Sequence, residues 1–235
     1  MKTPSIPPPA SKRWYVAFEV LHFRPKDQTE AVGSAWRNLI LIEADSAVNA
    51  LEHANELGMA NNSDVYIENE AGRAPARCTF AGLHELLIIE DGIRDGTIIG
   101  RAEVAPPAEI QEFRILERDA VLNEYVGVLP SWFITERLMS LGDSADEKWP
   151  QTELVLTFAR DPAEAFDKGL SGVFDGAHMG SALGLLDFAR VYDDIVDGGE
   201  LLWREYELGR GEVEIKAADE LSAIKQERKT GGENR

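Results

Sequence analysis

Two short acidic stretches hold the side chains that could most readily perform chemistry in this sequence. The first contains Glu90, Asp91 and Asp95, and the second contains Asp193, Asp194 and Asp197. Two or three carboxylates can hold a divalent cation, or divide the roles of general acid and general base between them. Such stretches are also typical of solvated loops in an acidic protein, so we expect neither a catalytic metal nor a catalytic residue in either one.

The stretch DGIRDGT, residues 91–97, begins like a calcium-binding loop. Such a loop also needs an oxygen ligand at its third position and a bidentate glutamate at its twelfth. Ile93 and Ala102 occupy those positions here, and Ile195 and Arg204 occupy them in the second acidic stretch. An Asp-Gly turn, in which glycine supplies a positive φ before a strand, explains the pattern better.

The histidines and the cysteine form no recognisable catalytic or metal-binding motif. His22, His53, His84 and His178 include no pair at the i,i+4 spacing that places two ligands on one helical face. Cys78 lies in the predicted strand RCTF, and a nucleophilic role would require a nearby base that lowers its pKa. We expect surface histidines and a half-buried structural thiol.

No cofactor motif is present either. Gly176, Gly180 and Gly184 recur at four-residue spacing, but they form neither GxGxxG nor GxxxxGK[ST], so they do not predict a phosphate loop. The GxSxG turn of serine hydrolases is also missing. We therefore expect no cofactor, and the interpretation leans away from an enzyme.

The charge balance is strongly acidic, with a formal net charge of -18 over 235 residues. This disfavours nucleic acid and anionic membranes as partners, because both require a basic surface. Residues 1–107 hold 15 acidic and 10 basic residues, whereas residues 108–235 hold 27 and 14. The second half would therefore dominate attraction to a basic protein, unless the charge serves only solubility.

Cellular location follows from features that the sequence lacks. One cysteine allows no intramolecular disulfide, and the opening MKTPSIPPPASKRW has no apolar region typical of a secretory signal. No run of about 18 apolar residues occurs. We expect a cytoplasmic protein.

The first half predicts an alternation of strands with one main helix. Residues 14–23 and 36–44 are typical of strands, and Asp45 or Ser46 can cap a helix that Gly58 closes. Two strands joined by a glycine turn follow, ending near Phe80. HELLIIEDGI predicts a short turn or helix, and 97–104 predicts a last strand.

The second half repeats this order. Residues 131–141 and 153–159 predict strands, and Asp161 with Pro162 predicts the start of a helix that ends at a glycine. Residues 38–53 align without a gap with 153–168, and 82–104 align with 184–206. The second copy lacks the region of the VYIENEAGRAPAR hairpin. Chance similarity of two amphipathic patterns is the alternative, but the matched order and caps favour a repeat.

We therefore predict an α+β fold of two tandem related units, each a small, mostly antiparallel sheet packed with one main helix. The expected divisions are a Pro-rich arm at 1–12, a first unit at 13–107, a connector at 108–130, a second unit at 131–208 and a polar, partly helical tail at 209–235. We expect a first core and a second core, formed respectively by Trp14, Val16, Leu39, Leu41, Leu51 and Phe80, and by Phe133, Leu154, Leu156, Phe166 and Phe188.

Three segments of the first unit carry a family resemblance. WYVAFEV, NLILIEADSAVNALEHANELG and RCTFAGLHELLIIEDGIRDGTIIGRAEV resemble a bacterial domain family of unknown function, number four two eight eight in its series. The resemblance covers roughly residues 13–105 and implies a fold. It brings no established activity and no site residues, and it reaches the second half only through the internal repeat.

The functional hypothesis combines the acidic second half with one tryptophan. Trp149 lies in a polar loop among acids, and such a residue can anchor a protein interface. The predicted protein-binding residues are Trp149, Asp143, Asp146, Glu147, Asp193, Asp194 and Asp197. We expect a non-catalytic binding or regulatory protein that binds a basic partner, as inhibitor and immunity proteins do. The alternative is a carboxylate-dependent hydrolase with its site between the two units.

Overall fold

The structure is a computed structural model of the whole chain. The residues it describes are 12–26, 34–69, 72–90, 92–94, 96–103, 114–125, 130–139, 151–174, 177–178, 182–196, 199–207 and 214–232. All structural statements below concern these residues.

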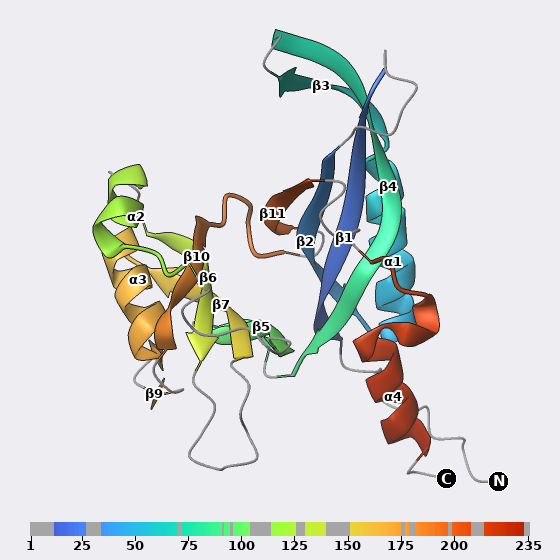
Figure 1. Ribbon diagram of the computed structural model, residues 1–235. Helices are drawn as coiled ribbons and strands as arrows, with labels where there is room; N and C mark the ends of the chain where they lie inside the picture. The colour runs from blue at the N-terminus through green and yellow to red at the C-terminus, as the bar shows by residue number, and fades with distance from the viewer. Residues whose placement is uncertain are drawn as a thin grey trace, which may run out of the picture.

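Two antiparallel sheets form the centre of the molecule (Figure 1). In order across the first sheet lie β11 (Glu200–Glu207), β2 (Ser34–Ala44), β1 (Arg13–Pro25), β4 (Gly72–Ile89) and β3 (Ser63–Asn69). In order across the second lie β10 (Ala182–Arg190), β6 (Ser131–Met139), β7 (Gln151–Ala159) and β5 (Thr97–Glu103). The short strands β8 (Val173–Phe174) and β9 (Ala177–His178) form a separate hairpin.

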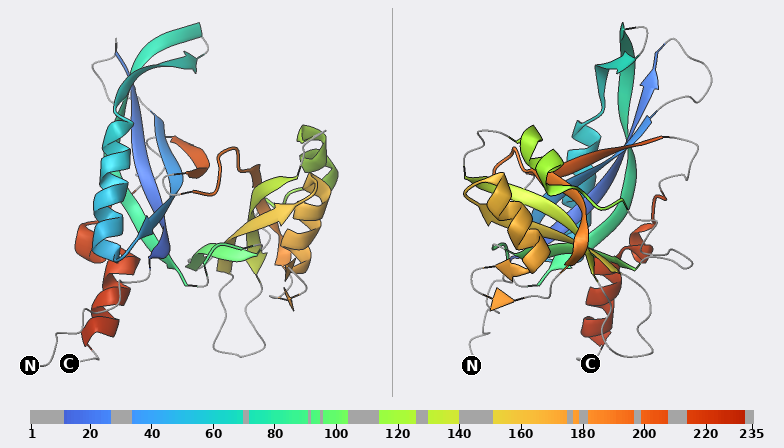
Figure 2. Two further views of the ribbon diagram at one scale, coloured as in Figure 1. Left: turned by 180° about the vertical axis from the view of Figure 1, so that it is seen from behind. Right: turned by 60° about the vertical axis from the view of Figure 1, so that its left-hand side comes forward.

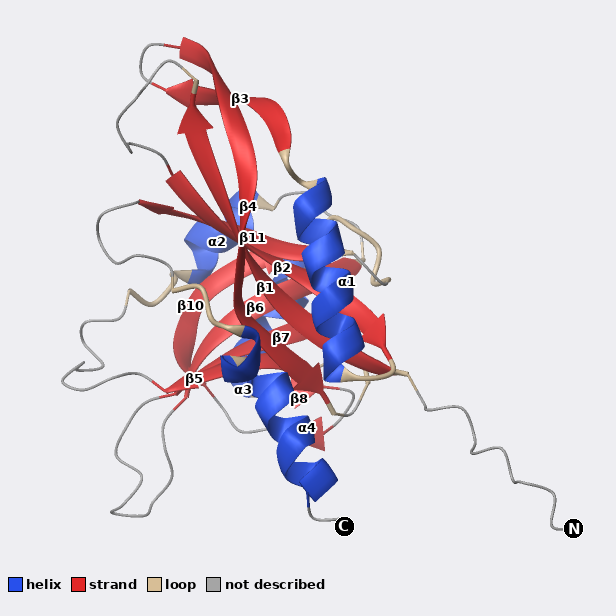
Figure 3. Ribbon diagram, turned by 90° about the vertical axis from the view of Figure 1, so that its right-hand side faces the viewer, coloured by secondary structure: helices blue, strands red, loops and turns tan. Residues whose placement is uncertain are grey.

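The helices cover the outer faces of the two sheets (Figures 1 and 2). On the first sheet lie α1 (Ala47–Ala60) and α4 (Ser222–Gly232), the latter preceded by the 3₁₀ turn η2 (Ala218–Glu220). Figure 3 views the molecule from this side, with both helices in front of the strands. On the second sheet lie α3 (Pro162–Ser171) and α2 (Arg118–Glu124). The predicted α+β fold of two related units, each a sheet with helices, is confirmed.

Three apolar cores match this layering. One lies between the first sheet and its helices, and one lies between the second sheet and its helices. The third lies between the sheets and joins residues of both, including Val16, Leu41, Ile134 and Leu156. The prediction that Leu41 and Leu156 belong to separate cores is therefore wrong. Strands such as β1 and β6 bury both faces, so their inward residues meet the other sheet and their outward residues meet the helices.

The two main helices begin as the sequence indicates. Ser46 caps α1 by accepting a hydrogen bond from the Asn49 backbone N–H at 3.2 Å. Asp161 caps α3 in the same way, accepting from the Glu164 N–H at 2.8 Å. Pro162 occupies the first turn of α3, and Gly172 ends it at a φ of 65°.

Gly58 does not end α1, contrary to the prediction, because the helix continues to Ala60. A Cβ at position 58 would clash with the Phe80 ring. This glycine therefore allows the helix to approach β4 closely, and its type reflects packing rather than a left-handed cap.

The segment HELLIIEDGI was predicted as a turn or short helix, but most of it belongs to β4, which continues to Ile89. Leu86 faces the helices and Ile89 faces the other sheet, so the strand is buried on both sides and lacks a clear alternation. Two register shifts against β1 further disturb its pattern.

Each unit receives its closing strand from the other unit. β5 follows the first unit in sequence but pairs with β7, and β11 follows the second but pairs with β2. Gly100 lies opposite Leu154, and Leu202 lies opposite Leu39, which are equivalent positions in the sequence overlay. A register shift interrupts both ladders at the same place. The two units therefore exchange strands reciprocally, in the same register.

The segments after the closing strands are exchanged as well. The Leu116 N–H donates to the Leu185 carbonyl at 2.8 Å, and the Lys216 N–H donates to the Leu83 carbonyl at 2.9 Å. The residue before each donor, Ile115 or Ile215, fills the space above Gly184 or Gly82 respectively. The repeat thus extends beyond the sequence overlay, to the residues that precede α2 and η2.

Within the described ranges, no helix is both long and apolar enough to span a lipid bilayer.

Candidate functional site

The described part of the predicted binding surface is the turn after β10. Asp193 and Asp194 are both exposed there. The other five predicted residues lie outside the described residues: Asp143, Asp146, Glu147, Trp149 and Asp197. In the first acidic stretch, Asp91 and Asp95 also lie outside them, whereas Glu90 is described.

A cavity of about 290 Å³ opens beside this turn. Its lining comes from the end of α2, the end of β10 with the turn that follows, and the start of β11: Tyr125, Ala189, Arg190, Tyr192, Asp193, Glu200, Leu201 and Leu202. The Glu200 N–H donates to Asp193 Oδ2 at 3.3 Å, which ties the turn to the exchanged strand. The strand exchange therefore creates this cavity, because β11 leaves the second unit here.

The two tyrosines of the cavity differ in exposure and role. Tyr125 packs edge-on against Phe188, with ring centroids 5.4 Å apart, and its hydroxyl donates to the Phe188 carbonyl at 3.2 Å. Burial raises the pKa of Tyr125, so it is a fixed, neutral part of the wall. Tyr192 is 79% exposed, and the Arg190 guanidinium lies over its ring at 5.3 Å from the centroid. Tyr192 is thus available to a partner.

A second carboxylate, that of Glu19, shares a hydrogen-bond donor with Glu200. The Asn38 side-chain amide donates to Glu200 Oε1 at 3.1 Å and to Glu19 Oε2 at 3.4 Å, and Asn61 donates to the same Glu19 oxygen at 3.5 Å. Glu19 is fully buried. Burial raises its pKa to about 7, Glu200 adds to that rise, and the hydrogen bonds from Asn38 and Asn61 oppose it. Glu19 does not line the cavity.

The first unit has an equivalent cavity of about 380 Å³. Its lining residues Leu87, Ile88, Glu90, Ile98, Ile99 and Gly100 overlay in sequence on Ala189, Arg190, Tyr192, Glu200, Leu201 and Leu202. The backbone arrangement repeats but the chemistry does not, since only the second cavity has an exposed aromatic ring beside acids. The polar site is therefore particular to the second cavity.

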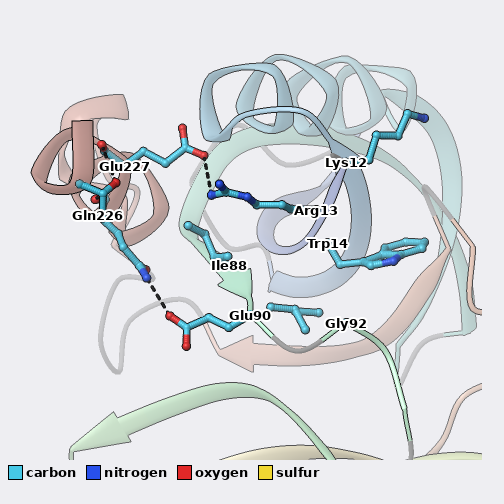
Figure 4. Close-up of a pocket in the computed structure, with 10 residues that line it drawn as sticks. Lys12, Arg13, Trp14, Ile88, Glu90, Gly92, Gln226 and Glu227 are labelled. Carbon is cyan, nitrogen blue, oxygen red and sulfur yellow. Dashed lines mark hydrogen bonds and ion pairs between the residues drawn. The ribbon is translucent and has the colours of Figure 1, made fainter. Parts of the chain in front are cut away.

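A third cavity, of about 390 Å³, lies between β1, the end of β4 and α4 (Figure 4). Its polar groups already pair across it. Arg13 lies 3.7 Å from Glu227, and Gln226 donates to Glu90 at 2.9 Å. These contacts attach α4 to the first sheet, so this cavity is better explained by packing than by ligand binding.

A buried ion pair in the second sheet was missed at the level of sequence. Arg137 on β6 donates to Glu153 on β7 at 2.7 Å, and both side chains are buried. Glu153 overlays on Asn38, and the strand partners of these two residues, Arg137 and Glu19, are therefore at equivalent positions. The sequence did indicate this pair through one feature, a charged residue at matching places in two mostly apolar strands, Glu19 in the first and Arg137 in the second.

The remaining reactive side chains are consistent with structural roles. Cys78 is buried, and burial raises the pKa of its thiol. Burial also lowers the pKa of His22 and of His84. Over the described ranges, no three His, Cys, Asp or Glu side chains gather in a way that could hold a metal ion.

Comparison with family models, with curated proteins and with solved structures finds no match to this chain.

Proposed function

We propose that this protein is a non-catalytic protein-binding module, regulatory in the manner of inhibitor or immunity proteins, which binds a basic partner. The binding region is the 191–196 surface, formed by Tyr192, Asp193, Asp194 and Val196 with the adjoining 290 Å³ cavity. The observation that supports it most is the 79% exposed Tyr192 beside two exposed aspartates at the mouth of that cavity.

The chemistry of this surface suits an arginine or lysine side chain of the partner. Its aliphatic stem would pack against Leu201 and Leu202, while its charged end would lie near Asp193 and Glu200. Arg190 already lies over one face of the Tyr192 ring, so the partner would contact the remaining exposed surface of this tyrosine. Tyrosines are frequent anchors of protein interfaces.

The excess negative charge of the second half would also speed encounter with such a partner. The predicted residues outside the described ranges, Trp149 with Asp143, Asp146, Glu147 and Asp197, belong to the same proposal. Further proposals are a cytoplasmic location, an origin by internal duplication and membership of the family that the first unit resembles.

A charge-matched pair of variants tests the binding surface. Asp193→Lys with Asp194→Lys reverses two acids on the 191–196 surface, and Glu52→Lys with Glu56→Lys reverses two exposed acids on α1. Both variants change the net charge equally. An arginine-rich peptide serves as the probe, with affinity and rates measured at several salt concentrations.

We expect the first variant to lower the affinity for the peptide at least about tenfold, mainly through slower association. The salt dependence of binding should also become flatter. The α1 variant should retain most of the affinity. Tyr192→Ala should mainly speed dissociation. Equal losses from the two charge variants would show that only net charge matters, and the proposed surface would then be wrong.

One observation favours the alternative, a hydrolase between the units. Glu19 from the first unit and Glu200 from the second are bridged by Asn38, and the raised pKa of Glu19 suits a general acid. Against this, Glu19 is fully buried and does not line the cavity. Hydrolysis of ester or glycoside substrates that is lost in Glu200→Gln would favour this alternative.

A further inference from the structure

The exchange between the units involves a strand, a crossing segment and a helix on each side. On the first sheet, β11 pairs with β2, and α4 packs across β4. Lys216 pairs with Glu85, and the Ser222 N–H donates to the same carboxylate at 2.8 Å. Tyr15 also donates to Glu227 of α4 at 3.0 Å. The second repeat thus completes the first sheet.

The reverse contacts complete the second sheet. β5 pairs with β7, and α2 packs beside α3. Arg118 of α2 forms a two-pronged ion pair with Asp167 of α3, with distances of 2.9 and 3.1 Å. Tyr125 packs on Phe188 and bonds to its carbonyl. Ile99 from the first repeat and Leu201 from the second both join the core between the sheets.

We propose that residues 1–125 and 130–235 are obligate partners that interlock as an exchanged dimer, so the covalent link between them is dispensable for association. Each half is shaped to bind the other half, which is a second copy of the same repeat. The acceptor surface is the outer edge of β2 or β7 together with the helix-facing side of β4 or β10.

The matched register supports this partner. The β11–β2 and β5–β7 ladders place equivalent residues opposite one another, and their registers shift at the same point. Ile115 and Ile215 each cover the equivalent glycine of the other unit. A surface that accepts one copy's strand and helix in this way is shaped for the repeat itself. Two independent domains lying side by side would not require their closing strands to cross over.

The experiment uses the full chain with a protease site, flanked by Gly/Ser spacers, inserted between Tyr125 and Pro130. After cleavage, confirmed on a denaturing gel, we expect the two pieces to elute together at the mass of the uncut protein. Cut protein is then mixed with isotope-labelled cut protein, and mixed pairs are followed by native mass spectrometry.

The interlocked pieces can separate only when both exchanged ladders, β11–β2 and β5–β7, break. We therefore expect mixed pairs to form no faster than the cut protein unfolds, and to form faster when urea is added. Pieces that separate after cleavage would overturn the proposal. Pieces that stay together but exchange within seconds in native buffer would also overturn it, because only surface association permits such speed.

A pair of variants locates the contact. Ile99→Asp with Leu201→Asp places charges on both exchanged strands, so the cut pieces should separate, whereas Phe166→Ala weakens only the outer core of the second sheet and should leave them joined. Retention of the double variant's pieces would contradict the exchange. If that variant does not fold before cleavage, the mixing rate of the parent protein decides the question.

Discussion

Glu19→Gln should stabilise this protein increasingly as the pH rises from 5 to 8. The buried carboxyl of Glu19 has a pKa raised from its ordinary 4.5 to about 7, mainly by burial. The folded protein therefore binds this proton more tightly than the unfolded chain does. Between these two pKa values the folded state holds more protons, so its stability falls as the pH rises.

The size of the effect follows from the two pKa values. A rise from 4.5 to about 7 corresponds to a penalty of about 3 kcal/mol once the group is ionised in both states, since each tenfold change in an equilibrium constant is worth about 1.4 kcal/mol. Glutamine has the shape of the protonated acid and can accept the hydrogen bonds of Asn38 and Asn61, but it does not titrate. The variant therefore avoids the penalty.

The assay is urea unfolding followed by tryptophan fluorescence at several pH values for both proteins. The gain in unfolding free energy should be small near pH 5 and approach about 3 kcal/mol near pH 8. Glu200→Gln is a useful companion, because removing the neighbouring charge should lower the pKa of Glu19 and give a smaller gain. A gain that does not change with pH would refute the buried carboxyl as its source.

Three further variants test the packing. Glu153→Gln removes the carboxylate 2.7 Å from buried Arg137, and should cost about 3–5 kcal/mol in urea unfolding, more than most surface changes. Gly58→Ala should destabilise α1 by about 1–3 kcal/mol despite its better helix propensity, because the added carbon meets Phe80; an increase in melting temperature would contradict this contact. Leu41→Ala should cost about 2–5 kcal/mol, and a loss below about 0.5 kcal/mol would contradict its place in the core.

Local features of the fold were predictable because they depend on neighbouring residues. Ser46, Asp161 and Pro162 mark helix starts through backbone hydrogen bonds that form within one turn. Strand exchange was not predictable, because β5 would meet the edge of β2 with the same register and alternation that it uses on β7. Sequence periodicity describes which faces of a strand are apolar, and it does not specify which copy of an edge the strand joins.

The candidate site was predictable only in part, for a similar reason. Asp193 and Asp194 follow an apolar strand and precede a turn, so their exposure follows from local pattern. The cavity beside them needs Tyr125 and Leu202, which lie far away in the sequence and meet only through the exchange. Residues that line a site between exchanged elements carry no common spacing.

The repeat gives the buried charged side chains a role in correct strand pairing. A chain with two similar units can fold wrongly by pairing the first strand of one with the second strand of the other. In the native pairing Glu19 lies opposite Asn38, and Arg137 lies opposite Glu153. Pairing β1 with β7 in the equivalent register would bury Glu19 opposite Glu153, and pairing β6 with β2 would bury Arg137 opposite an amide. Two facing carboxylates in a core, or an arginine without its carboxylate, cost far more than the native pairs. The divergence at these positions therefore opposes mispairing within each sheet, while the closing strands remain free to cross between the sheets.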